Sequence, residues 1–61
     1  MSEDHDLLVY RGYVIDRWEI GAMWNVRVVR AERLVWGPVA YLTAEAALID
    51  AKRAVDIDLN D

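Results

Sequence analysis

Apolar and polar residues alternate along the first two thirds of the chain, and the spacing of the apolar residues then changes to three and four. Trp24, Val26 and Val28 fall on one face of an extended segment. Asn25 and Arg27 fall on the other face, as expected of a strand with one buried side. Further along, at about 100° per residue, one helical stripe contains Ala44, Ala47, Leu48, Ala51, Ala54 and Val55. The change of period predicts strands followed by a helix.

Three strands precede the predicted helix, over about Val9–Trp18, Met23–Arg30 and Leu34–Leu42. Gly21 lies in the first connection, where the conformational freedom of glycine suits a tight reversal. Gly37 and Pro38 interrupt the third strand. Because proline lacks a backbone N–H, we expect that strand at a sheet edge or with a bulge. The sequence therefore predicts an α+β fold, a three-stranded antiparallel β-meander packed on one C-terminal α-helix (βββα).

The start of the predicted helix is marked by a capping residue. The Thr43 hydroxyl can accept a hydrogen bond from an N–H of the first turn, and Glu45 lies where the helix dipole favours a negative charge. The alanine-rich stripe allows the helix to lie close to the sheet. We therefore expect the helix to begin directly after Thr43.

The charge of the chain is concentrated at its two ends. The net charge is −4, and residues 1–6 and 56–61 carry three carboxylates each. Residues 7–55 hold seven basic and five acidic side chains, which leaves 7 − 5 = +2. We expect a single domain over 7–55, between an acidic flexible tail at 1–6 and an acidic C-terminal tail at 56–61. The apolar runs are too short for a membrane span and the acidic N-terminus does not resemble a signal peptide, so we expect a cytoplasmic protein.

The composition indicates more apolar surface than one short helix can cover. Hydrophobic residues make up 56% of the chain, three of them are tryptophans, and no cysteine is present to form a disulfide. A domain of this size without disulfides depends on packing alone. Because self-association would bury the remaining apolar surface, we expect a homodimer.

Side chains suited to catalysis are scarce. The chain has one serine, one threonine and one histidine, and Ser2 and His5 both fall in the predicted N-terminal tail. A nucleophile with an adjacent base cannot be assembled from these residues in one protomer. A single imidazole makes no defined metal site, and the three glycines are isolated rather than arranged in a phosphate-binding loop. We therefore expect no enzyme activity, no cofactor, no bound metal and no small-molecule substrate.

The sheet face that the helix leaves uncovered is the candidate functional surface. We expect a partner or nucleic-acid surface that includes Arg11, Val14, Trp18, Asn25, Arg27 and Ile49. Four of these follow from strand alternation, and Arg11 joins them if Gly12 marks a bulge. Ile49 lies off the apolar stripe of the helix, as either an ordinary exposed side chain or a partner contact. Arginine and tryptophan are enriched at protein interfaces and also contact nucleic acids, whereas an ordinary solvated face is a third interpretation.

Several short motifs occur in the order that is found in a known family. They are Tyr10-Arg11-Gly12, Trp18, Gly21, Trp24, Val35-Trp36-Gly37 and Thr43-Ala44-Glu45, followed by alanines at 46, 47, 51 and 54. Over residues 10–55 the chain resembles the Apetala-type ethylene-response-factor DNA-binding domain. The resemblance implies a three-stranded antiparallel sheet that packs on one helix and enters the major groove of DNA. It also implies that DNA is contacted by Arg11, Trp18, Trp24 and either Arg27 or Arg30.

Two functions from different classes fit these observations. The first is a small non-catalytic protein-interaction module that acts as a homodimer, such as an accessory or inhibitor protein of a phage or mobile element, with an unidentified protein partner. The alternative is a DNA-binding domain that uses the exposed sheet face. We favour the first function because acidic tails disfavour approach to a polyanion.

Overall fold

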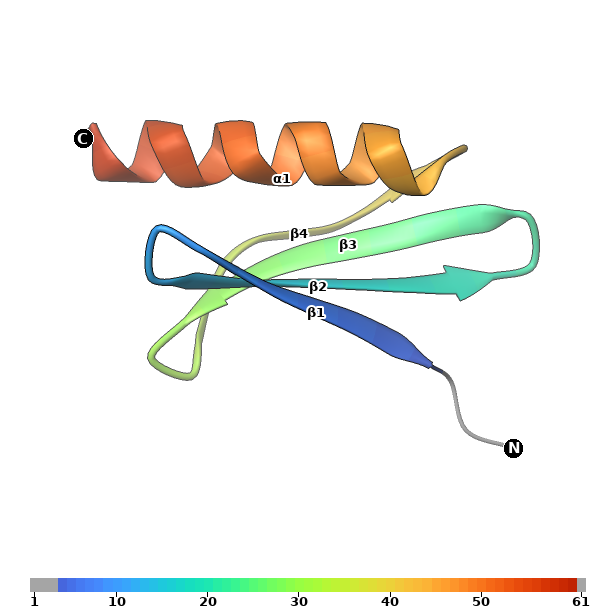
Figure 1. The fold of residues 1–61 in the computed structure, drawn as a ribbon, viewed down its shortest axis with the longest axis horizontal. Coiled ribbons are helices and arrows are strands. Elements are labelled where there is room, and N and C mark those ends of the chain that lie inside the picture. The colour runs from blue at the N-terminus through green and yellow to red at the C-terminus, as the bar shows by residue number, and fades with distance from the viewer. Residues whose placement is uncertain (1–3, 61) are drawn as a thin grey trace.

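Four strands precede one helix in the computed structural model, which describes residues 4–60. The elements are β1 His5–Tyr10, β2 Tyr13–Ile20, β3 Met23–Arg30, β4 Arg33–Tyr41 and α1 Ala44–Leu59. The strands form one antiparallel sheet in the order β1-β2-β3-β4, and α1 lies across one face of it (Figure 1). The α+β class and the single C-terminal helix are therefore confirmed.

The number of strands differs from the prediction, because the sheet has four strands and not three. The predicted first strand divides at Arg11 and Gly12, whose φ angles are 55° and 86°. Positive φ at both central positions is the geometry of a two-residue hairpin turn that matches the twist of its strands. Gly12 therefore reverses the chain instead of forming a bulge within one strand, and the sheet gains β1 at one edge.

Both predicted tails contribute residues to regular elements. β1 begins at His5, which pairs with Trp18, and α1 continues past Val55 to Leu59. The domain therefore extends beyond the expected limits of 7–55 in both directions. Residues 1–3 and 61, which complete the predicted acidic tails, lie outside the described residues.

β4 is the second edge of the sheet, and its pairing with β3 is irregular. The register shifts between Val26 and Val28 and again between Val28 and Val29. Gly37 has a φ of 94°, and a Cβ added to it would lie 2.6 Å from the backbone oxygen of Val26, so only glycine fits without a shift of the backbone. Pro38, which has no N–H, follows it. The predicted edge position and irregularity of this strand are confirmed.

The core lies between α1 and the face of the sheet that α1 covers. Among residues 4–60, the buried hydrophobic side chains are Tyr13, Ile15, Val26, Val28, Ala47, Ala51 and Val55. They come from β2, β3 and α1, and none comes from β1 or β4. Trp36 and Tyr41 of β4 and Leu48 of α1 pack against this core while partly exposed. The alternating apolar side chains of β3 and the alanine-rich stripe of α1 therefore face the core, as predicted.

The N-terminal end of α1 has the predicted cap. The backbone of Thr43 is extended, and its Oγ1 accepts a hydrogen bond of 3.1 Å from the backbone N–H of Ala46. Glu45 lies in the first turn. At the other end, the N–H of Asn60 donates to the carbonyl oxygen of Asp56 at 3.1 Å, which closes the last turn.

Candidate interaction surface

The sheet face opposite α1 carries a row of aliphatic side chains that crosses all four strands. The strand register pairs Val9 with Val14 and Val29 with Leu34. Val14 pairs with Val29 across the two central strands, which completes the row. We call these four residues the aliphatic row. Val9 and Leu34 at its ends are 71% and 59% exposed, and Leu7, two residues from Val9 on the same face of β1, is 65% exposed.

Beside the aliphatic row, the uncovered face carries the carboxylate of Asp16, which neighbouring side chains cover. Asp16 is only 4% exposed although it faces away from α1. Its Oδ1 lies 2.7 Å from Nδ1 of His5, and its Oδ2 accepts a hydrogen bond of 2.9 Å from Nε of Arg27. The Trp18 ring stacks on the His5 ring with their centroids 4.9 Å apart, and the Arg27 guanidinium lies 5.5 Å from the Trp18 ring centroid. We call these four residues the polar cluster, and its ionic groups are paired within the chain, as buried charges require.

Arg17 connects three elements on the covered side of the sheet. Its Nη1 donates a hydrogen bond of 3.0 Å to the carbonyl oxygen of Ala44 at the start of α1. Its Nη2 donates to the carboxylate of Asp6 in β1. The Nε of Arg17 is buried with no hydrogen-bond partner among residues 4–60. Arg17 and the polar cluster therefore hold β1 through polar side chains on both faces of the sheet.

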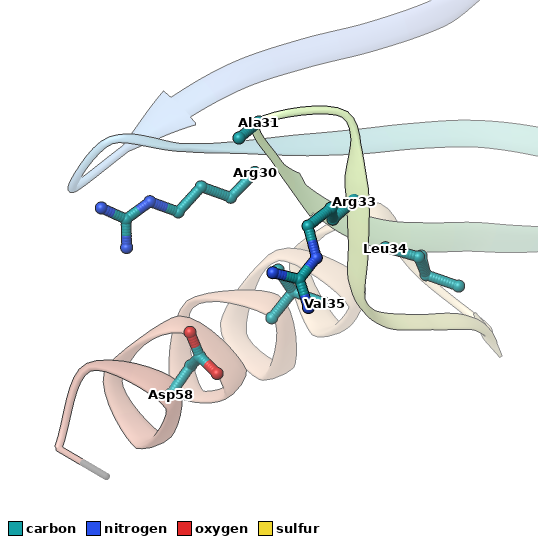
Figure 2. A pocket seen from close by; sticks show the side chains of 6 residues that line it. All are labelled: Arg30, Ala31, Arg33, Leu34, Val35 and Asp58. Atoms are coloured by element: carbon teal, nitrogen blue, oxygen red, sulfur yellow. The ribbon is translucent and has the colours of Figure 1, made fainter.

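A hollow of about 500 Å³ lies between the β3–β4 turn and the C-terminal end of α1 (Figure 2). It is lined by Arg30, Ala31, Arg33, Leu34, Val35 and Asp58. Nη1 of Arg30 donates to Oη of Tyr13 at 3.1 Å, and Oη of Tyr13 donates to Asp58 at 2.5 Å. The last turn of α1 contains no basic residue, so Arg30 and Arg33 supply the positive charge that a helix C-terminus favours. Because Arg30 bonds to Tyr13 within the chain, we interpret Arg30 as structural.

The structure brings four of the predicted surface residues together on the uncovered face, namely Val14, Trp18, Asn25 and Arg27. Arg11 lies in the β1–β2 turn instead, and its Nη1 donates a hydrogen bond of 2.8 Å to Asp56 of α1. That hydrogen bond raises the pKa of the Arg11 guanidinium above its ordinary value. Ile49 is 58% exposed on α1, in the other layer of the fold. The expectation that Arg11 joins the uncovered face is wrong, because Gly12 forms a turn rather than a bulge.

The prediction missed six residues of the uncovered face, namely His5, Leu7, Val9, Asp16, Val29 and Leu34. His5, Leu7 and Val9 are spaced two residues apart, so in a strand their side chains lie on the same face. This signal is weak, because acidic residues beside His5 are equally typical of a solvated tail. Asp16 gives no local signal, since its burial depends on side chains from β1 and β3.

The part of the chain that the structure describes contains neither a candidate metal site nor a candidate membrane-spanning helix. Within residues 4–60, no group of three or more His, Cys, Asp or Glu side chains is placed to hold a metal ion. Over the same residues, no helix has both the length and the apolar character needed to cross a membrane.

Comparison of the chain with models of protein families, with curated proteins and with solved structures finds no match. The resemblance to the Apetala-type ethylene-response-factor domain therefore stays a prediction.

Proposed function

We propose that this chain is a small non-catalytic protein-interaction module that acts as a homodimer. The observation that carries the proposal is the exposure of aliphatic side chains on the uncovered side of the sheet. Leu7, Val9 and Leu34 are each more than half exposed, although complete burial of such a side chain contributes about 1.5–3 kcal/mol. Contiguous exposed apolar surface of this kind typically marks an interaction site.

The charges of the uncovered face favour a second copy of the chain as the partner. A symmetric dimer brings each surface charge close to its own copy, so a face with net charge repels itself. On the uncovered face, Asp16 and Arg27 form an ion pair and cancel each other. Two copies can therefore place their uncovered faces next to each other without like-charge repulsion.

The scarcity of catalytic groups also supports a binding role. Nδ1 of His5 is engaged with Asp16, and the hydroxyl of Thr43 caps α1. Both side chains therefore have structural contacts that a catalytic role would have to replace.

DNA binding, the alternative implied by the family resemblance, has weaker support. Arg11, Arg17 and Arg27 are paired with carboxylates of the same chain. Phosphates bind by gaining contacts with available cations, so DNA would have to compete with these carboxylates. The neutral aliphatic row provides no contact that a polyanion favours.

Size-exclusion chromatography with light scattering tests the proposal over about 1 µM to about 1 mM, a range that detects any dimer with a dissociation constant below about 1 mM. We expect twice the mass of the chain at the upper end. A mobility-shift assay with duplex DNA at low salt provides the second arm. A monomer at every concentration contradicts the homodimer, and a monomer that shifts DNA supports the alternative function instead.

A further inference from the structure

We propose that the two copies of the homodimer join through β1, which pairs antiparallel with β1 of the second copy so that the two sheets become one continuous sheet. This inference rests on the proposed function and deepens it by naming the interface. In this arrangement both helices lie on one side of the joined sheet. The exposed Leu7 and Val9 of both copies lie beside the junction on the other side, whereas Leu34 lies away from it.

β1 lacks the features that keep an edge strand from pairing with another chain. Natural proteins block sheet edges with prolines, bulges, lysines or a covering element. β1 contains no proline and no lysine, and it pairs with β2 over all six of its residues without a register shift. β1 contains one carboxylate, that of Asp6, and its charge is paired with Arg17 of the same chain. Among residues 4–60, no strand pairs with the outer edge of β1, so a further strand can pair there.

The β1–β2 turn determines which backbone groups of β1 face outward. In a two-residue hairpin, the closing pair, here Tyr10 and Tyr13, exchanges both backbone hydrogen bonds. Counting back from Tyr10, every second residue of β1 then bonds to β2. The residues between them direct their N–H and C=O groups away from the sheet, and these are His5, Leu7 and Val9.

One register uses these outward groups best. With Leu7 opposite Leu7 of the second copy, His5 lies opposite Val9 in both directions, which gives three hydrogen-bonded pairs with two bonds each. A shift of the register by two residues in either direction leaves only two such pairs within β1. The Leu7-centred register also places Asp6 opposite Leu8 of the second copy, which keeps the two Asp6 carboxylates apart.

The opposite edge explains why the assembly ends at two copies. β4 carries Pro38, the left-handed Gly37 and two register shifts, so it presents no regular ladder to a further strand. Pairing uses both β1 edges, and only β4 edges remain at the ends of the joined sheet. Association through β1 therefore gives a closed two-fold dimer and not a filament.

A pair of matched substitutions separates edge pairing from face-to-face packing along the aliphatic row. Leu7 and Leu34 are leucines of similar exposure on the same face, at opposite edges of the sheet. L7K places two ammonium groups opposite each other across the proposed two-fold axis, and we expect the dissociation constant of the dimer to rise by about 100-fold or more. L34K adds the same charge far from β1, and we expect a change of less than about 3-fold.

Cysteine substitutions test the register directly, because the chain contains no cysteine. Hydrogen-bonded antiparallel pairs have Cα atoms about 5.5 Å apart, within the range that a disulfide spans. Under mild oxidation at low protein concentration, we expect L7C to form a covalent dimer and L34C to stay largely monomeric. Circular dichroism checks that each variant is folded. The L7C crosslink is a positive signal, so this test does not depend on a variant that weakens the dimer.

The outcomes distinguish the two proposals. Dimer loss in L7K with a dimeric L34K, together with the L7C crosslink, supports edge pairing. Dimer loss in L34K, or a crosslink in L34C but not in L7C, overturns edge pairing and leaves the homodimer with a face-to-face arrangement. A wild-type chain that is monomeric throughout overturns both.

Discussion

β1 and β4 form the two edges of one sheet, but different interactions hold them. β4 presents Trp36 and Tyr41 to the core, and its backbone at Gly37 lies against β3. β1 presents Tyr10 to the core, and polar contacts of Asp6 and His5 supplement its backbone pairing. If β1 pairs with a second copy as we propose, stability and association are located at opposite edges of the sheet. β4 packs against the core through Val35, Trp36 and Tyr41, whereas β1 does so through Tyr10.

The largest expected effect comes from Gly37→Ala at the β4 edge. The added Cβ would lie 2.6 Å from the backbone oxygen of Val26 at a φ of 94°, so the backbone must shift. We expect the free energy of unfolding to fall by about 3 kcal/mol or more, measured by urea denaturation. Gly21→Ala is the control, because its φ is 61° but no atom lies within 4 Å of the added Cβ, and it should cost about 1–2 kcal/mol. Equal effects would show that the β3–β4 contact is not tight.

Asp16→Ala tests the link between β1 and the central strands. The substitution removes both the contact with His5 and the hydrogen bond from Arg27. We expect a loss of about 2–3 kcal/mol in the free energy of unfolding, since hydrogen bonds to charged groups contribute more than neutral ones. Glu19→Ala on the exposed end of β2 is the control and should change stability by less than about 0.5 kcal/mol. An Asp16 variant as stable as the control would show that the contacts of Asp16 do not stabilise the attachment of β1.

Thr43→Ala tests the connection from β4 to α1. The substitution removes the acceptor for the N–H of Ala46. We expect a cost of about 1 kcal/mol, measured by thermal or urea unfolding. Thr43→Ser keeps the acceptor and should retain most of the stability, so two equally destabilised variants would argue against a capping role.

The final prediction depends on pH and also lies at the β4 edge. Burial of the Tyr41 phenol, together with its hydrogen bond of 2.8 Å to Asp50, raises the pKa of Tyr41 from 10.0 to about 12. Because the fold favours the protonated phenol, this contribution to stability is complete below pH 10 and is lost as the pH rises towards 12. The stability difference between wild type and Tyr41→Phe should therefore shrink over this interval in denaturation curves. A constant difference would contradict the raised pKa.

The core could be predicted from the sequence because burial produces its periodicity. Val26 and Val28 alternate with polar residues, and Ala47 and Ala51 recur at helical spacing, so each pattern reports a buried face. β1 could not be predicted in the same way, because Tyr10 is its one side chain packed against the core and a single residue produces no periodic pattern. Its existence depends on the Arg11–Gly12 turn and on pairing with β2.

The candidate surface also contains some features that local patterns predict and others that they do not. Strand alternation correctly places Trp18 and Arg27 on the uncovered face. The burial of Asp16 and the contact of Arg11 with Asp56 depend on residues 11 and 45 positions away in the chain. Local patterns carry no information about such contacts.

Amide hydrogen exchange in the wild-type chain, followed by NMR, tests the β1 interface most directly. The N–H of Leu8 points toward β2 and serves as the internal reference. We expect the N–H groups of Leu7 and Val9 to be protected at high protein concentration and to lose that protection on dilution, while Leu8 stays protected. Rapid exchange at Leu7 and Val9 at every concentration, beside a protected Leu8, would contradict the pairing of β1 with a second copy.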